Sequence, residues 1–387
     1  MFSILLAVIY LSYISLGLPD SLPGAAWPSM QPLLGVPMSC AGILSMLIAC
    51  STVISSLLAD RLLRRFGTGL VAACSVLLTA AALLGYSAAG RFSVLCVLAV
   101  PYGLGAGAVD SALNHYVAVH YPARHMNWLH CFWGIGAAAS PYIISFHLRH
   151  AAGDWQSGYR TVAVIQMTLT VMLFCALPLW KPTEPSEEES CRSVPCSPLR
   201  ELLRRRQVRR SLAAFFCSSA FESTAGLWLS SFLVCRRGLS AGAAARFASC
   251  YYIGITAGRV LSGLLAERMG DRRLIRCGLL CAAAGTVLLF LPHAGTACCG
   301  LIVTGFGAAP VYPCMLHQTP AVYRKAEVQR MIGLEVAAGY IGTTLVPPLA
   351  GWAASGSGMN AVPVLMLLLA AAQLWLTCCE KKRHHGL

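Results

Sequence analysis

The sequence predicts an all-α membrane protein, with twelve transmembrane helices arranged as two pseudo-symmetric six-helix bundles. Hydrophobic residues make up 57% and charged residues 11% of the 387 positions, and the mean hydropathy is +0.66. Such a chain has too little polar surface for a water-soluble fold of this length. In addition, the segment Ser-Ser-Leu-Leu-Ala-Asp-Arg at 55–61 returns as Ser-Gly-Leu-Leu-Ala-Glu-Arg at 262–268, which indicates two related halves.

The membrane spans are predicted from stretches of about 20 apolar residues, the length that crosses ~30 Å of hydrocarbon. They lie near 3–27, 38–59, 68–89, 93–119, 128–148, 160–180, 210–234, 241–265, 273–292, 297–319, 330–354 and 360–379. The first run has no charged leader and no small-residue cleavage site, so we predict a first helix and not a signal peptide. The hydrophilic stretch then divides the chain into a bundle at 1–180, a cytoplasmic linker at 181–209, and a bundle with a short tail at 210–387.

The basic residues predict the orientation. Of the 29 Lys and Arg, 22 fall in the connections after the even-numbered spans and in the tail, whereas six fall in the opposite loops. The positive-inside bias therefore places both termini in the cytoplasm of a multi-pass plasma-membrane protein. This orientation explains the net charge of +14, so no nucleic-acid partner is expected. The remaining basic residue, Arg259, lies within the eighth span.

An acid and an arginine followed by further basic residues end both copies of the repeated segment. They are Asp60-Arg61 with Arg64-Arg65, and Glu267-Arg268 with 271–273. This pattern resembles the loop signature of the major facilitator superfamily. The second copy, with Gly270, is the closer match, because the first has Leu-Leu where a glycine is usual and reaches its glycine only at Gly67.

At the cytoplasmic helix ends, the charges of this signature are predicted to pair across the two halves and to hold one of two packings. The gate residues of this hypothesis are Asp60, Arg61, Arg65, Glu267, Arg268 and Arg272. The alternative is an ordinary set of charged helix ends.

Further stretches are similar to the fucose permease group of this superfamily: 17–21 through 24–28, 127–130 with 134–136 and 140–141, and Glu222 with Trp228. The resemblance implies alternating access and proton-coupled import of a sugar. It also implies that Asp20 and Asp110 take the roles of the two acids that such proteins carry in their first and fourth helices. The second position is a glutamate in the fucose permease and an aspartate in this chain.

Four acids inside predicted spans are the proton-coupling candidates: Asp110, Asp20, Glu222 and Glu335. A carboxylate without a cationic partner is costly in low dielectric, so we expect it to hold a proton much of the time. Asp110 is followed one turn later by Asn114 on the same face. Pro19 before Asp20 predicts an interrupted helix with a polar pocket. The alternatives are a loop position for Asp20 and an ion pair with Arg330 for Glu335.

A polar, uncharged ligand is bound by aromatic rings that stack on it and by side chains that meet its hydroxyl groups. The substrate-binding candidates are Asp20, Trp27, Asn114, Asn127, His130, Trp133, Glu222, Tyr252, Tyr312, Gln318 and Tyr340. Each of them alternatively serves packing, helix contacts or anchoring at the membrane interface.

The function that these features favour is secondary active transport, as proton-coupled symport of a sugar or similar small polar solute by a monomer in the lipid bilayer. A multidrug or metabolite efflux antiporter of the same superfamily is the alternative. We find no clustered nucleophile and base, so an enzyme is not expected, and we predict no cofactor and no metal site. A sensor or scaffold without transport stays open.

Overall fold

The computed structural model describes residues 4–121, 123–150, 154–180 and 199–378, apart from the side chains of a few further residues, among them Asp60, Asn127 and Glu267. These ranges form fifteen α-helices and one short 3-10 helix. The helices are α1 (Ile4–Asp20), α2 (Leu22–Leu34), α3 (Cys40–Phe66), α4 (Thr68–Ala88), α5 (Phe92–His120), α6 (Ala123–His150), α7 (Trp155–Cys175), η1 (Leu177–Leu179), α8 (Leu199–Arg204), α9 (Arg206–Arg237), α10 (Ala241–Met269), α11 (Asp271–Leu288), α12 (Ala294–Ala308), α13 (Val311–Val322), α14 (Lys325–Ser357) and α15 (Ala361–Cys378).

The described helices give twelve spans, as predicted, when α1 joins α2, α12 joins α13 and α8 is set aside. By length and hydropathy alone, eight segments qualify as spans, and α15 is a shorter apolar helix. The remaining three, α6, α10 and α11, carry more polar and charged residues, mostly near their ends. The two ends of the molecule are named as follows. The proximal end is the one where the described chain begins and ends. The distal end is the one with the turns at Gly35, Gly238 and Gly358.

The sixth span differs in position from the predicted stretch near 160–180. Its helix, α7, begins five residues earlier because Asp154 caps it by accepting a hydrogen bond from the Ser157 N–H at 3.0 Å. It ends at Cys175, and the chain continues as η1, which contains Pro178. A proline shortly after a helix end is common because it cannot continue the helix.

Two spans are interrupted near their middle. A turn at Ser21 separates α1 from α2, which confirms the break predicted beside Pro19, and Ala309 and Pro310 separate α12 from α13. Each break leaves backbone groups without their usual helical partners. The first break places the Asp20 carboxylate at the middle of its span.

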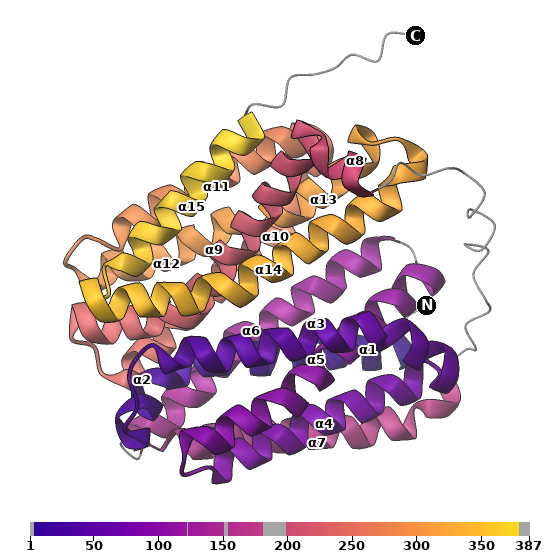
Figure 1. The fold of residues 1–387 in the computed structure, drawn as a ribbon. Coiled ribbons are helices and arrows are strands. Elements are labelled where there is room, and N and C mark those ends of the chain that lie inside the picture. The colour runs from indigo at the N-terminus through magenta and orange to yellow at the C-terminus, as the bar shows by residue number, and fades with distance from the viewer. Residues whose placement is uncertain (1–3, 122, 151–153, 181–198, 379–387) are drawn as a thin grey trace.

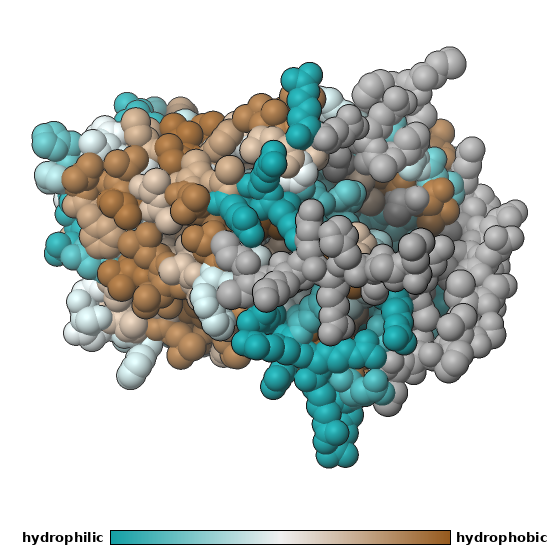
Figure 2. Space-filling model, turned by 90° about the horizontal axis from the view of Figure 1, so that it is seen from above, coloured by the Kyte–Doolittle hydropathy of each residue, from teal (hydrophilic) through white to brown (hydrophobic). Residues whose placement is uncertain are grey.

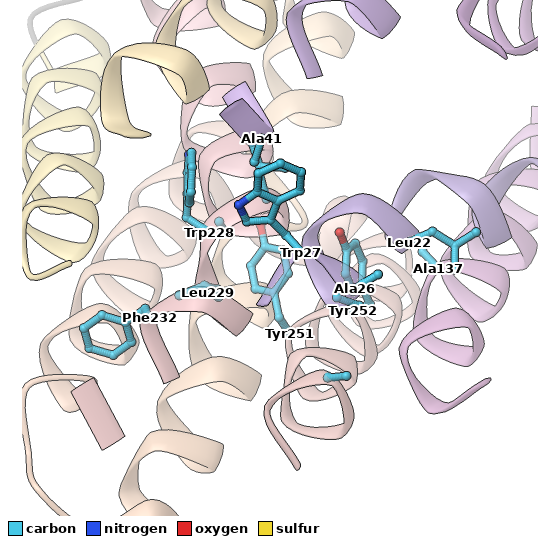
Figure 3. Packing of buried hydrophobic residues seen from close by; sticks show 14 of the residues in the cluster. Leu22, Ala26, Trp27, Ala41, Ala137, Trp228, Leu229, Phe232, Tyr251 and Tyr252 are labelled. Atoms are coloured by element: carbon cyan, nitrogen blue, oxygen red, sulfur yellow. The ribbon is translucent and has the colours of Figure 1, made fainter. Parts of the chain in front are cut away.

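The two halves of the chain form two groups of helices that lie lengthwise against each other (Figure 1). Between the groups, α6 packs against α10, α3 against α14, and α2 against α9. One buried cluster runs through both groups, and Figure 3 shows Trp27 of α2 near Trp228 of α9 and Tyr251 of α10. This common core holds the halves together, and we infer a division into two bundles joined by the chain before α9.

The helix α8 is tied to the second half by an arginine. Arg205 donates to the Glu327 carboxylate at 2.9 Å and to Glu201 at 3.3 Å. The hydrogen bond that Arg205 donates to Glu327 raises the pKa of Arg205 above its usual value. The first part of the predicted linker, 181–198, lies outside the described residues.

The outer surface of the spans is strongly apolar. Leu57, Trp352, Leu264 and Val97 are each at least 70% exposed. In the view from above, brown hydrophobic residues cover much of the face, and teal hydrophilic residues gather beside the segments drawn in grey (Figure 2). Exposed side chains of this kind suit contact with lipid, so the molecule is a multi-pass membrane protein.

The two copies of the repeated segment end in the same backbone turn. Gly67 after α3 has φ 76° and ψ 157°, and Gly270 after α10 has φ 74° and ψ 150°. The helix α3 continues four residues further beyond the repeat than α10 does, which is about one helical turn. The late glycine of the first copy therefore makes the same turn as Gly270, one turn of helix later.

Candidate functional site

The centre of the site is a chain of contacts that crosses from one half to the other. The Trp133 indole N–H of α6 donates to the Asp20 carboxylate of α1 at 2.7 Å. The guanidinium of Arg259, in α10, lies 4.8 Å from the centroid of the Trp133 ring, and it pairs with the Glu222 carboxylate of α9 at 3.4 Å. Arg259 also faces the backbone carbonyl of His130 at 3.5 Å. Two acids from different halves are thus linked through one indole and one guanidinium.

The second predicted acid of the first half is Asp110 of α5, which contacts α1. Asp110 accepts hydrogen bonds from the Tyr13 hydroxyl at 3.1 Å and from the Asn114 amide at 3.0 Å. The bond to Asn114 confirms that the two side chains share one face of α5. Tyr13 in turn stands edge-on to the His130 ring, with 5.9 Å between centroids. Asp110 therefore has two neutral donors.

Aromatic side chains surround this group from both halves. Tyr252 of α10 meets the Trp133 ring edge-on at 6.4 Å. Tyr340 of α14 lies near Ser56 of α3 and near Asp110. Tyr312 of α13 packs edge-on against the Phe215 ring. Rings and carboxylates together can hold a ligand that is polar along its edge and apolar on its faces.

The exposure of the central side chains shows that they are not sealed in the core. Asp20 is exposed although it lies at the middle of its span and accepts a hydrogen bond from Trp133 of α6. The side chains of Glu222 and Arg259 are 30% and 18% exposed. Asp110 and Asn114 are half-buried. At this depth, accessible polar groups suit an internal space that water and a solute can enter.

Two predicted site residues lie elsewhere. Trp27 is fully buried, and its indole N–H donates to the Met38 carbonyl at 3.0 Å, so it packs between the halves and does not join the central group. Gln318 lines a separate pocket near the proximal end. The side chain of Asn127 lies outside the described residues.

The fourth predicted acid, Glu335, also lines the proximal pocket and not the central group. Its carboxylate accepts hydrogen bonds from Ser211 at 2.5 Å and from Thr319 at 2.7 Å, and it is 1% exposed. These donors come from α9 and α13, so Glu335 of α14 links three helices of the second half.

The predicted gate residues lie at the proximal ends of α3, α10 and α11. Arg61, Arg65, Arg268 and Arg272 are exposed, and Arg65 lies against the Phe66 ring. The side chains of Asp60 and Glu267 lie outside the described residues, so pairing across the halves at this end stays a prediction.

Sequence reasoning missed two partners in the central group. Tyr13 lies seven residues before Asp20, which is two helical turns and therefore the same face of α1; this spacing was a usable signal. The pairing of Arg259 with Glu222 joins α10 to α9, and only their similar depth in the membrane hinted at it.

Twelve spans in two related halves, with charged groups where the halves meet, define a membrane transporter built on a duplicated helical bundle. The chain belongs to the major facilitator superfamily, whose model matches residues 9–249 and 237–385. This match confirms the resemblance that the sequence predicted. Members of this family are transporters of small molecules and not enzymes.

Known proteins similar to this chain include one curated relative and several solved structures. "Bypass of stop codon protein 6" of Saccharomyces cerevisiae is 22% identical over 402 residues, which cover 93% of this chain and 78% of that protein. A variant of the nucleoside transporter NupG superposes with a TM-score of 0.77 at 12% identity, covering 96% of this chain and 97% of its own.

Two further structures share the fold. A bacterial homologue of the human lysosomal transporter Spinster, in an inward-facing and occupied conformation, has a TM-score of 0.71 at 12% identity, covering 97% of this chain and 95% of its own. A variant of the Escherichia coli fucose:proton symporter FucP has a TM-score of 0.64 at 16% identity, covering 97% and 98%. At these identities the likeness establishes the fold.

Proposed function

We propose that this protein is a secondary active transporter that couples the movement of a small polar solute, a sugar or a nucleoside, to the movement of protons. The solute binds between the two halves, which rock about it, and both termini face the cytoplasm at the plasma membrane. The observation that carries the proposal is the group of Asp20, Trp133, Arg259 and Glu222, because it joins acids of both halves at the middle of the membrane.

The proton-binding role goes to Asp20 and Asp110 because the side chains that donate hydrogen bonds to them in the described structure are neutral. Trp133 donates to Asp20, and Tyr13 and Asn114 donate to Asp110. A carboxylate in such surroundings gains more from binding a proton than one that faces a cation. Glu222 is different because Arg259 balances its charge, and we assign that pair to substrate binding.

The solute class follows from the side chains around the acids. Tyr252 and Trp133 offer ring faces and edges, while Asn114 and Tyr340 offer hydrogen-bonding groups. A sugar ring or a nucleoside has hydroxyl groups at its rim and a less polar face, which suits this mixture. The structural neighbours named as a nucleoside transporter and a fucose:proton symporter support the same class.

The distal end supports a conformation that is closed on that side. About one helical turn from Asp20 toward the distal end, Gly24 of α2 approaches the Gly226 carbonyl of α9 so closely that a Cβ on Gly24 would lie 2.1 Å from its oxygen. Similarly, a Cβ on Gly42 of α3 would lie 2.5 Å from Pro348 Cα of α14. Backbone contacts of this kind between the halves exclude a solute from passing, so we assign the structure to a state closed toward the outside.

Uptake into liposomes containing the purified protein tests the proposal. We expect radiolabelled sugars or nucleosides that stabilise the protein in a thermal-shift screen to accumulate against their gradient when a pH gradient is applied. The variant Asp110→Asn should lose this uphill uptake and keep part of the solute exchange. The control Glu201→Gln makes the same chemical change at a surface acid of α8 and should transport normally.

Two results would reject the proposal. One is uphill uptake by the Asp110→Asn variant at the normal rate and with normal proton coupling. The other is a protein that binds and exports apolar drugs in exchange for protons while no sugar or nucleoside stabilises it, which would favour the efflux antiporter.

A further inference from the structure

A second pocket lies near the proximal end, inside the second half and away from the central group. It is formed by α9, α11, α13, α14 and α15 and is partly open to the solvent. Its charged lining consists of Arg210, Arg272, Arg276 and Glu335. Three guanidinium groups against one carboxylate give this space an excess of positive charge.

Two of these arginines are held in an arrangement that favours an anion. Arg272 and Arg276 are four residues apart on the first turns of α11, so they are neighbours on one helix face. Like charges at this spacing repel each other. Within the described residues neither arginine forms an ion pair. A bound anion between them removes this repulsion.

In the described structure the single carboxylate of the pocket forms no ion pair with Arg272 or Arg276. Glu335 is buried, and its two oxygens already accept hydrogen bonds from Ser211 and Thr319. The amide nitrogen of Gln318 is buried without a hydrogen-bond partner in the described structure. Because an amide nitrogen is a donor, the unsatisfied group in the pocket calls for an acceptor.

Much of the remaining lining of the pocket is apolar. Ile275, Met315 and Val322 line it, and Arg210 lies 5.9 Å from the ring centroid of Trp375. Trp375 is 60% exposed on α15. An exposed tryptophan beside an arginine is typical of the membrane interface, where lipid head groups lie.

We propose that this pocket binds a phosphate group, carried either by an anionic phospholipid or by a soluble phosphate. A phosphate offers several acceptor oxygens, and arginine binds them with two parallel N–H groups. Basic pockets between helices at the cytoplasmic side suit this chemistry. The site is separate from the central group, so it does not depend on which solute the protein transports.

Binding to the purified protein in detergent tests the proposal. The probes are inorganic phosphate, short-chain phosphatidylglycerol, and short-chain phosphatidylcholine as the zwitterionic control, followed by thermal shift and native mass spectrometry. We expect phosphatidylglycerol or phosphate to bind more tightly than phosphatidylcholine. The double variant Arg272→Gln with Arg276→Gln should weaken this binding at least about tenfold.

The matched control is Arg246→Gln, which removes one exposed arginine near the distal start of α10 and should bind as the wild type does. Binding of phosphatidylglycerol alone assigns the site to a lipid head group, and equal binding of inorganic phosphate assigns it to a soluble phosphate. The proposal is overturned if the wild type prefers neither probe over phosphatidylcholine, or if the double variant binds as tightly as the wild type.

If the double variant does not fold, the salt dependence of binding to the wild type tests the proposal. Screening by salt weakens contacts between a phosphate and exposed arginines, so wild-type affinity for the bound probe should fall steeply between low and high salt. Affinity independent of salt overturns the proposal as well. Neither measurement uses transport, so a failure of the phosphate-binding proposal is distinct from a failure of the proposed function.

Discussion

The indole N–H of Trp133 lies 2.7 Å from a carboxylate oxygen of Asp20, and this one bond connects the broken helix of the first half to the helix that packs on the second half. The same ring faces the guanidinium of Arg259. A negative Asp20 strengthens the bond from the indole, because hydrogen bonds to charged acceptors are stronger than those to neutral ones. Trp133 is therefore placed to respond to the charge of Asp20 while it contacts the opposite half.

The first prediction concerns this bond. The variant Trp133→Phe keeps a ring near Arg259 and removes the donor to Asp20. The loss of a hydrogen bond to a charged group costs about 1.5–3 kcal/mol, which corresponds to roughly tenfold or more. We expect uptake driven by a pH gradient to fall by about this factor, measured in liposomes.

The control for this substitution is Trp352→Phe, at a tryptophan of α14 that is 75% exposed on the outer surface. It should transport as the wild type does. Equal uptake by the Trp133→Phe variant and the wild type would show that the Asp20 bond has no part in coupling.

The second prediction concerns the ion pair between Arg259 and Glu222. Removing one partner leaves the other charge at the middle of the membrane without its counter-ion, which is costly. We expect the double variant to lose less stability than the sum of the losses in the single variants Arg259→Gln and Glu222→Gln. The interaction free energy from a double-mutant cycle should be about 0.5–3 kcal/mol, measured by thermal unfolding in detergent. Strictly additive effects would show that the pair does not interact.

The positions of the acids along the helices were predictable, whereas their partners were not. The length of the apolar stretches placed Asp20, Asp110 and Glu222 inside membrane spans, and Pro19 indicated where the first span is broken. The partner of Glu222 depends on how α9 and α10 are rotated toward each other, and no periodicity within one helix contains that information. Spacing within a helix did succeed for Asp110 and Asn114.

The aromatic residues also show that the sequence alone did not predict long-range packing. Trp27 and Trp133 both follow glycine-rich or polar stretches, and both were substrate candidates from sequence alone. In the structure Trp27 is sealed between the halves, while Trp133 is half-buried beside two charged groups. The difference arises from the contact of α2 with α9, which is a long-range packing feature. Composition and hydropathy therefore predicted the fold, and packing decided the site.

The third prediction concerns Glu335 and its donors. Ser211→Ala leaves one oxygen of a buried carboxylate without this donor, which costs about 1–3 kcal/mol. We expect a lower unfolding temperature in detergent, and a smaller loss for the control Ser357→Ala, whose hydroxyl bonds only to its own helix and is exposed. An unchanged unfolding temperature for Ser211→Ala would show that the Glu335 contact does not stabilise the second half.

The fourth prediction follows from the matched turns of the repeat. Gly67 and Gly270 share a backbone conformation that residues with a side chain adopt only at a cost of about 1–3 kcal/mol. Alanine at either position should therefore lower the free energy of unfolding by a similar amount, measured by thermal unfolding. Markedly unequal losses would contradict the equivalence of the two turns.

The fifth prediction concerns the distal contact between the halves. In Gly24→Ala the new methyl group would meet the Gly226 carbonyl, so α2 and α9 must separate. Overpacking of this kind costs about 1–3 kcal/mol, which disfavours the distally closed state by roughly 5–150-fold. We expect uptake to fall while a bound solute still stabilises the protein in a thermal-shift assay.

The control for this change is Gly295→Ala, because a Cβ at that glycine of α12 meets no atom within 4 Å. It adds the same methyl group without touching the interface and should transport normally. Hydrogen exchange at α2 distinguishes a shift in closure from general instability, since only a shift raises exchange at α2 and α9 while the rest of the protein stays protected. Normal uptake by Gly24→Ala would mean that this glycine pair does not form the distal closure.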